Sequence, residues 1–169
     1  MSISRQNLTI VIVTFKSEEV IHECINSIGN GIKIIIVENS NNPEFKNKIE
    51  KTYSNVECVI STENLGMGRG NNLGINLAKT DYVLILNPDV VLEKSTMDEL
   101  FIASNLISNF TILAPISDKK NYPNYQIDNG QEISKTIKSS FEVKSVDGFA
   151  MLINKKKIEE TMNTKNLNY

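Results

Sequence analysis

The sequence predicts an α/β domain whose central, mainly parallel sheet has helices on both faces. Three largely apolar, β-branched runs indicate strands: Leu8 to Phe15, Ile32 to Val37 and Tyr82 to Leu86. The last of them is apolar throughout, which indicates a strand buried on both faces. Helical patterns separate these runs, and such alternation is typical of parallel strands joined by right-handed crossovers. The 169 residues are expected to form one domain, 1–169, with a sizeable core.

The first helix is expected soon after Phe15. Ser17 is placed to cap it, and Glu18 and Glu19 lie in its first turn, where the helix dipole favours acids. Gly29 is a typical helix end. Between them lies one apolar face, made of Val20, Ile21, Cys24, Ile25 and Ile28.

The second helix is predicted to start at Asn42-Pro43-Glu44, with the proline at its first position. Phe45 and Ile49 would form its buried stripe, and Val56 to Ser61 is expected to be the third strand.

A glycine-rich segment from Asn64 to Gly70 follows and is predicted to be a loop. A short helix comes next, with Leu73 and Leu77 one turn apart. The dinucleotide-binding pattern of glycines does not fit, because Gly74 comes one place late and the segment follows the third strand. A P-loop is also excluded, because no Gly-Lys-Ser/Thr is present.

The second half of the chain predicts further short elements. Ser95 to Asp98 matches a capping box, before a helix whose inner face is Met97, Leu100, Phe101 and Ser104. A helix is expected to begin at Lys155. Strands are expected at Thr111 to Ile116, Glu142 to Val146 and Phe149 to Ile153. The polar residues 117–140 fit either a solvated connection or a flap over a substrate.

Composition excludes several classes of protein. Lys and Arg number 18 and Asp and Glu 20, so nothing indicates a nucleic-acid partner. No apolar run approaches the ~20 residues of a membrane span, and residues 1–7 lack a signal peptide's apolar segment. Cys24 and Cys58 are expected to be buried free thiols. The expected location is the cytoplasm, and contact with the inner face of a membrane stays open.

Polar residues follow the apolar strands where chemistry is expected. Ligands of open α/β sheets bind beyond the carboxyl ends of the strands. Asn87-Pro88-Asp89 ends its strand abruptly, because proline cannot continue the ladder, and this aims the Asp89 carboxylate outward. We expect the strand ends at Phe15, Glu38 and Asn87 to lie along one edge of the sheet.

Four motifs in order resemble family 2 glycosyltransferases, which have the GT-A nucleotide-sugar-binding fold. They are Val13-Thr14-Phe15-Lys16, Val37-Glu38-Asn39-Ser40, Asn64-Leu65-Gly66-Met67-Gly68 with Asn72-Leu73-Gly74-Ile75, and Asn87-Pro88-Asp89. The agreement covers residues 8–92, and a weaker match continues to Gly148-Phe149-Ala150-Met151-Leu152. The Asn-Pro-Asp form is most similar to the rhamnosyltransferase-like branch.

The resemblance implies a metal-assisted nucleotide-sugar site. Asp89 would hold Mg²⁺ or Mn²⁺ on the diphosphate, since Mg²⁺ commonly uses one or two carboxylates plus phosphate oxygens and water. Asn87 replaces the first carboxylate of the commoner Asp-x-Asp pattern and adds no charge, so metal affinity without nucleotide should be low. The alternative is that Asp89 is only a turn residue after a strand.

The resemblance also implies contacts to the donor. Glu38 would accept the N3–H of uracil or thymine, although the family usually has Asp there. Thr14 and Phe15 would meet the base and ribose, while Asn64 and Gly66 would let the backbone approach the nucleotide closely. Each has a plain structural alternative, in strand-end packing or a flexible turn. Arg69 would reach a phosphate or be a solvated arginine.

The family's general base is expected in a Glu-Asp-like motif after Met151, and no such pair follows. Asp147 is then the candidate base, or else a turn residue. Residues 8–92 would be the donor-binding part and 93–169 an incomplete acceptor part, truncated at the C-terminus. The expected function is inverting transfer from a UDP- or dTDP-sugar to a hydroxyl of a saccharide or lipid-linked acceptor, with slow transfer or none by this chain alone. The alternative is a non-catalytic nucleotide-sugar-binding module.

Overall fold

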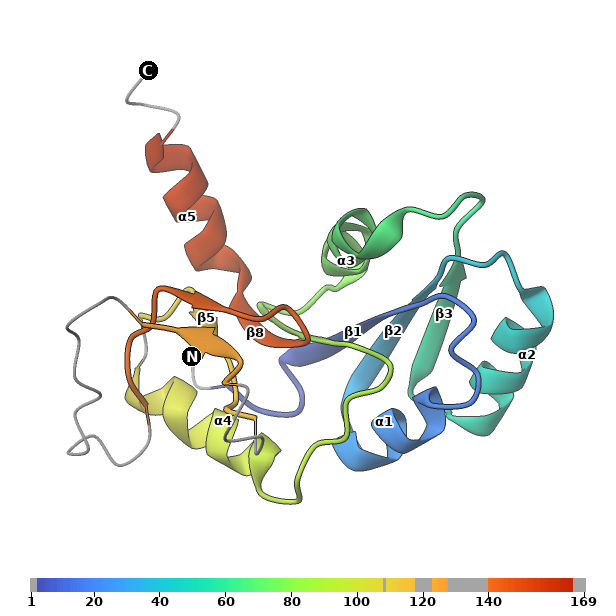
Figure 1. The fold of residues 1–169 in the computed structure, drawn as a ribbon, viewed down its shortest axis with the longest axis horizontal. Helices are drawn as coiled ribbons and strands as arrows, with labels where there is room; N and C mark the ends of the chain where they lie inside the picture. Colours follow the sequence, from blue (N-terminus) through green and yellow to red (C-terminus); the bar gives the residue numbers. More distant parts are fainter. Residues whose placement is uncertain (1–2, 108, 118–122, 128–139, 166–169) are drawn as a thin grey trace.

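The computed structural model describes residues 3–107, 109–117, 123–127 and 140–165, the last four of them by their backbone alone. A six-stranded sheet has the order β3-β2-β1-β4-β8-β5, and β6 and β7 form a separate two-stranded sheet (Figure 1). The strands are β1 (Leu8–Thr14), β2 (Lys33–Glu38), β3 (Val56–Ile60), β4 (Tyr82–Leu86), β5 (Ile112–Leu113), β6 (Tyr125–Gln126), β7 (Ser145–Val146) and β8 (Ala150–Asn154). The helices are α1 (Ile21–Ile28), α2 (Pro43–Thr52), α3 (Gly66–Leu77), α4 (Thr96–Leu106) and α5 (Lys155–Lys165).

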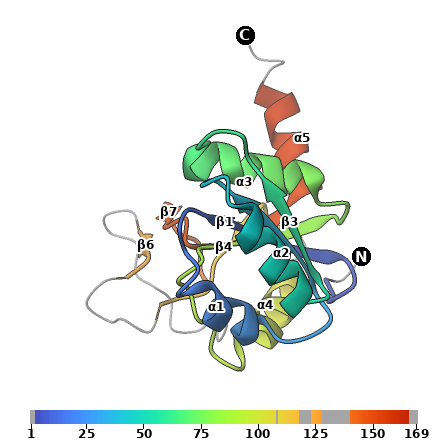
Figure 2. The ribbon, with the colours of Figure 1, turned by 90° about the vertical axis from the view of Figure 1, so that its right-hand side faces the viewer.

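Alternate residues of the buried strands face two separate layers of helices. On β1, Ile10 and Ile12 belong to the core shared with α1, α2 and α4, whereas Val11 packs in the core formed with α3 and α5. Figure 2 shows α3 on one side of the sheet and α1 and α4 on the other. The predicted α/β fold with helices on both faces is confirmed, and period-two burial on both sides explains why these strands are continuously apolar.

The predicted parallel pairing holds for β1 to β4. β1 pairs with β2 and β4, and β2 with β3, all in parallel. β8 is antiparallel to both β4 and β5, so the sheet is mainly rather than wholly parallel.

Several strands in the second half are shorter than expected. The strand predicted over 111–116 is limited to β5, and that over 142–146 is limited to β7, which pairs with β6 instead of joining the main sheet. Much of the polar region 117–140 lies outside the described residues, so neither interpretation of it is tested.

The glycine-rich segment is a helix, which corrects the predicted loop. α3 already begins at Gly66, and its buried residues are Gly70 and Gly74, not Leu77, which is exposed. A Cβ on Gly74 would lie 2.3 Å from a methyl of Val11, and one on Gly70 would lie 2.9 Å from a methyl of Val13. Glycine therefore serves here to let α3 pack closely against β1.

Only one of the three expected helix caps forms. The Asn42 side chain accepts from the Phe45 backbone N–H at 3.0 Å, with Pro43 at the first helical position, as predicted. The Ser17 cap was wrong: α1 begins at Ile21, and the Ser17 hydroxyl bonds to Phe15 instead. Ser95 precedes α4 but also forms no side-chain cap.

The free border of β3 is covered by a charged pair from α2. Both polar backbone groups of Cys58 point away from β2. Its N–H donates to a Glu50 carboxylate oxygen at 2.8 Å, and its carbonyl accepts from the Lys46 ammonium. Lys46 and Glu50 also form an ion pair of 2.7 Å one helical turn apart. α2 thus occupies hydrogen-bonding positions that an edge strand otherwise offers to another chain.

We expect this pair to make stability depend on pH. The hydrogen bond from Lys46, with a smaller contribution from the Cys58 N–H, lowers the pKa of Glu50 from 4.5. A carboxyl group whose pKa is lower in the folded state than in the unfolded state stabilises the native state at pH values above its unfolded-state pKa. This stabilisation is lost as the pH falls through the folded-state pKa. Urea unfolding measures the free energy of unfolding of wild type and of Glu50→Gln. The difference between the two should be largest near about pH 7 and vanish near about pH 3.

Glu19→Gln is the matched control, because Glu19 is an exposed carboxylate outside α2. It should not reproduce the pH-dependent difference. An equal difference between wild type and Glu50→Gln at both pH values would contradict the assignment.

Candidate functional site

The carboxyl ends of four strands meet at one edge of the sheet. Thr14 is the register partner of Glu38, and Glu38 of Ile60, while Ile12 is the partner of Leu86. The backbone continues this alignment, since the Asn39 N–H donates to the Thr14 carbonyl at 2.9 Å. The expectation that the ends at Phe15, Glu38 and Asn87 share one edge is confirmed. Phe15 lies there with half of its surface exposed (50%).

Asp89 lies in a tight turn at this edge. The Asn87 N–H donates to the Phe149 carbonyl at 2.8 Å, which extends the pairing of β4 with β8 by one residue. The Val90 N–H then donates back to the Asn87 carbonyl at 3.2 Å and closes the turn over Pro88 and Asp89. Asp89 is exposed, and within the described residues its carboxylate has no hydrogen bond or ion pair. The carboxylate is therefore available to a ligand.

Cys24 of α1 lies behind this turn. Its Sγ is 3.5 Å from the Asn87 carbonyl oxygen, and the residue has no exposed surface. Burial, and to a smaller extent the charge of Asp89, raises the pKa of the Cys24 thiol to about 12. The group therefore stays protonated and donates a hydrogen bond. Cys24 and Cys58 are both buried free thiols, as predicted.

The Glu38 carboxylate turns back onto the chain that follows β2. One oxygen accepts from the Ser40 N–H at 2.8 Å and also from the Ser40 hydroxyl, and the other accepts from the Asn42 N–H at 2.7 Å. The residue is 1% exposed. Its carboxylate thereby holds the turn that leads into α2.

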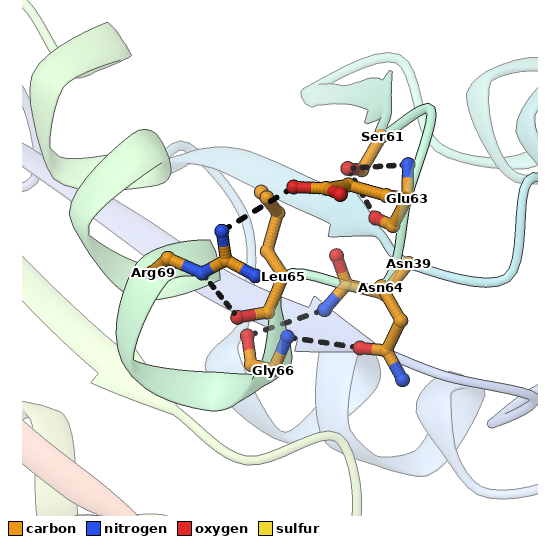
Figure 3. A network of polar contacts seen from close by, with 7 residues as sticks. All are labelled: Asn39, Ser61, Glu63, Asn64, Leu65, Gly66 and Arg69. Carbon is orange, nitrogen blue, oxygen red and sulfur yellow. Dashed lines mark hydrogen bonds and ion pairs between the residues drawn. The ribbon is translucent and has the colours of Figure 1, made fainter.

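Polar contacts order the start of α3 (Figure 3). The Asn64 side chain accepts from the Gly66 N–H at 2.9 Å, and Gly66 has a φ of 67° that favours glycine. Arg69 donates to the Leu65 carbonyl at 3.2 Å and pairs with Glu63 at 3.3 Å. The Arg69 side chain is 66% exposed, so this pair is weak and the guanidinium remains accessible.

Asn39 is a residue of this site for which the sequence analysis predicts no role. It is 4% exposed, and its Nδ2 donates to the Gly66 carbonyl at 3.3 Å, which ties the end of β2 to the start of α3. Its Oδ1, like the buried Thr14 Oγ1, has no partner in the described structure. The only sequence signal for Asn39 was its place in the motif after β2, because a buried amide bond across two elements leaves no periodic pattern.

Asp147 lies on the segment that enters β8. Asp147 is exposed, and its backbone N–H donates to the Asn124 carbonyl at 2.8 Å. Phe149, whose carbonyl holds Asn87, follows shortly after it. Asp147 is thus connected through a short stretch of backbone to the turn that carries Asp89.

The sheet edge at the carboxyl ends of the strands, where Asp89 lies, suits a metal ion that takes most of its ligands from substrate and water. No group of three or more His, Cys, Asp or Glu side chains able to hold a metal exists within 3–107, 109–117, 123–127 and 140–165. Asp89 offers one unpaired carboxylate, and the half-buried Asn87 lies beside it. Mg²⁺ and its relatives are commonly held by one or two carboxylates with phosphate and water oxygens, so these residues fit such an ion.

A family model described as glycosyl transferase family 2 matches residues 9–161. The chain belongs to glycosyltransferase family 2. Its mostly parallel sheet with surrounding helices is the GT-A fold of that family. The likeness to the rhamnosyltransferase-like branch remains an expectation.

Two curated relatives of this family 2 member are a hexosyltransferase and a glucosyltransferase. The low-salt glycan biosynthesis hexosyltransferase Agl10 of Haloferax volcanii is 30% identical over 113 residues, covering 64% of this chain and 36% of that protein. A poly(ribitol-phosphate) beta-glucosyltransferase of Bacillus spizizenii is 32% identical over 92 residues, covering 48% of this chain and 14% of that protein. The chain therefore spans about a third or less of these relatives.

Solved structures confirm the GT-A fold. The mannosyltransferase PcManGT of Pyrobaculum calidifontis, in complex with GDP-Man and Mn²⁺, has a TM-score of 0.67 at 12% identity, covering 94% of this chain and 47% of that one. S. aureus TarS 1–349 in complex with UDP-GlcNAc has a TM-score of 0.62 at 14% identity, covering 92% and 47%. Of the helices that the structure describes, none is both long and apolar enough to cross a bilayer.

Proposed function

We propose that this family 2 glycosyltransferase binds a nucleotide diphosphate sugar at the edge that carries Asp89 and transfers the sugar, with inversion, to a hydroxyl group. The donor would be a UDP- or dTDP-hexose, including a rhamnosyl donor, and the acceptor a saccharide or lipid-linked saccharide of a cell-surface polysaccharide. The observation that carries the proposal is the exposed, unpaired Asp89 carboxylate at the carboxyl edge of a GT-A sheet. Hexosyltransferase relatives support the type of reaction.

Asp89 would hold Mg²⁺ or Mn²⁺ with help from the Asn87 amide oxygen. The ion neutralises the charge that grows on the diphosphate as the glycosidic bond breaks. The chain's own part is to keep one carboxylate in a fixed turn, free of competing partners. The Mn²⁺ in the PcManGT complex supports this choice of ion.

The remaining donor contacts are proposed for other residues at the same edge. Phe15 offers an exposed ring to a base or ribose, and the buried Thr14 hydroxyl beside it has no partner in the described structure. Asn64 and Gly66 lie at the exposed start of α3, where Arg69 has an accessible guanidinium for a phosphate. A contact from Glu38 to a pyrimidine N3–H would require its carboxylate to give up a bond to Ser40 or Asn42.

Asp147 is the proposed general base for the acceptor hydroxyl. It is an exposed carboxylate next to the segment that holds Asn87. A base of this kind typically contributes about 10²–10⁴ in rate without being needed for donor binding. Single-turnover transfer of labelled sugar by Asp147→Asn measures this role. The sugar, the acceptor, the role of residues 93–169 on the acceptor side and contact with a membrane are proposals for the whole protein.

Calorimetry with UDP, dTDP and GDP, each with and without Mn²⁺, tests the proposed function. We expect at least one nucleotide to bind with an affinity that rises when Mn²⁺ is added, because Asp89 alone is a poor metal site and becomes a good one beside a diphosphate. Mn²⁺ alone should bind weakly. No binding of any nucleoside diphosphate in either condition would refute the proposal, and binding without transfer would favour a non-catalytic binding module.

A further inference from the structure

Helix α1 contacts the Asp89 turn on both sides of the carboxylate. Before Asp89, the Cys24 thiol lies 3.5 Å from the Asn87 carbonyl oxygen. After it, the Leu92 backbone N–H donates to the Ser27 hydroxyl oxygen at 3.0 Å. The Ser27 hydroxyl in turn donates to the Cys24 carbonyl at 2.7 Å. Two residues one turn apart on α1 are therefore linked to each other and to both ends of this segment.

Other contacts restrain the turn at its two ends. The Asn87 N–H bonds to Phe149, and the Val90 N–H closes the turn on the Asn87 carbonyl. The Leu92 side chain is buried in the core that includes α1, and the Val90 side chain packs against the same core. The exposed Asp89 side chain lies between these fixed points and forms no hydrogen bond or ion pair within the described residues. Its position thus depends on the backbone at residues 87 and 92.

The Cys24 thiol and the Ser27 hydroxyl can both form stable hydrogen bonds to the backbone of the 87–92 segment. The Cys24 thiol lies within hydrogen-bonding distance of the Asn87 carbonyl oxygen, at 3.5 Å, and the residue has no exposed surface, so water does not compete for this contact. The Ser27 hydroxyl bonds to a carbonyl on its own helix, a common arrangement that orients the oxygen toward an incoming N–H. The polar atoms of both residues are bonded to backbone groups of α1 or of the 87–92 segment, so their effect on a ligand would pass through the turn.

We infer that Ser27 and Cys24 are positioning residues for Asp89, which hold the Asn87–Leu92 segment so that the carboxylate meets a metal bound to a nucleoside diphosphate. The inference rests on the proposed function of Asp89. Partners behind a metal ligand commonly change metal affinity by about 10–100-fold when they are removed. A role in stability alone would instead affect all ligands and conditions alike.

Ser27→Ala is the direct test, because alanine favours the helix and removes only the hydroxyl. Ser27→Thr keeps the hydroxyl and serves as the rescue variant, and Asn26→Ala is the control at a neighbouring exposed position on α1. Two measurements are made on the full chain. One is hydrogen exchange of residues 87–92, and the other is calorimetry of UDP and GDP with and without Mn²⁺.

We expect Ser27→Ala to speed exchange in residues 87–92 and to weaken Mn²⁺-dependent nucleotide binding by about 10-fold. Its metal-free nucleotide affinity should stay at the wild-type value, and Ser27→Thr and Asn26→Ala should resemble wild type. Unchanged Mn²⁺ dependence in Ser27→Ala, or an equal loss with and without Mn²⁺, would overturn the inference.

The same experiment separates this inference from the proposed function. If wild type binds no nucleotide in a Mn²⁺-dependent way, the metal role of Asp89 is wrong and the positioning role falls with it. If wild type does so but Ser27→Ala behaves identically, only the positioning role is wrong. In both cases, the exchange data report whether α1 restrains the turn.

Discussion

Asp89→Asn should lower Mn²⁺-dependent affinity for a nucleoside diphosphate by about 100-fold, or ~2.7 kcal/mol. The substitution keeps the size and turn preference of the side chain but removes the unpaired charge that would bind the ion. Nucleotide binding without metal should change little, because the other proposed contacts at this edge come from Phe15 and the start of α3. Calorimetric titrations at fixed Mn²⁺ concentration measure the effect.

Asp81→Asn is the matched control for this experiment. Asp81 is also exposed and precedes the same strand, β4, but it lies at the opposite edge of the sheet. The Asp81→Asn variant should bind nucleotide and Mn²⁺ as wild type does. If Asp89→Asn kept full metal-dependent affinity, a different residue would have to be the ligand.

Gly74→Ala should destabilise the fold by about 2–3 kcal/mol, although alanine is the better helix former. The new methyl group would lie 2.3 Å from a Val11 methyl, and Val11 is fully buried in the middle of β1. Since a β-branched side chain on a central strand has little freedom to move, α3 must shift away from the sheet. Urea unfolding at neutral pH measures the loss.

Gly68→Ala on the same helix is the control. A Cβ there would meet nothing within 4 Å, so alanine should stabilise by about 0.5–1 kcal/mol. The double variant Gly74→Ala/Val11→Ala should lose less stability than the sum of the two single variants, with a coupling energy of about 1 kcal/mol or more. Equal stabilities of Gly68→Ala and Gly74→Ala would show that α3 does not pack this closely.

Features that depend on local pattern could be predicted from the sequence. The strands from β1 to β4 are rich in apolar, β-branched residues, and their parallel order follows from the helices between them. Asn42 and Pro43 signal the start of α2 directly. The common edge for Phe15, Glu38 and Asn87 then follows from topology alone, so the location of the candidate site needed no tertiary information.

Features that depend on contacts between residues far apart in the sequence could not be predicted from it. A run with Gly66, Gly68 and Gly70 is typical of a loop, and the sequence does not show that Gly70 and Gly74 lie against Val13 and Val11 of β1. The Glu38 carboxylate was expected to be free, but its side chain is long enough to return to its own turn. Ser27 lies beside an apolar face and gives no sign that it holds the Leu92 backbone, because that bond joins residues far apart in the chain.

The covered border of β3 has a consequence for self-association. Growth of a sheet from molecule to molecule into a fibre requires two free borders on each copy, one to accept a strand and one to offer the next. Lys46 and Glu50 occupy the backbone groups of Cys58, and the Val56 N–H already donates to the Tyr53 carbonyl at 3.1 Å. Strand addition is then directed to the β5 side of the main sheet. Two copies joined there would both present β3 outward, so such association would stop at a pair.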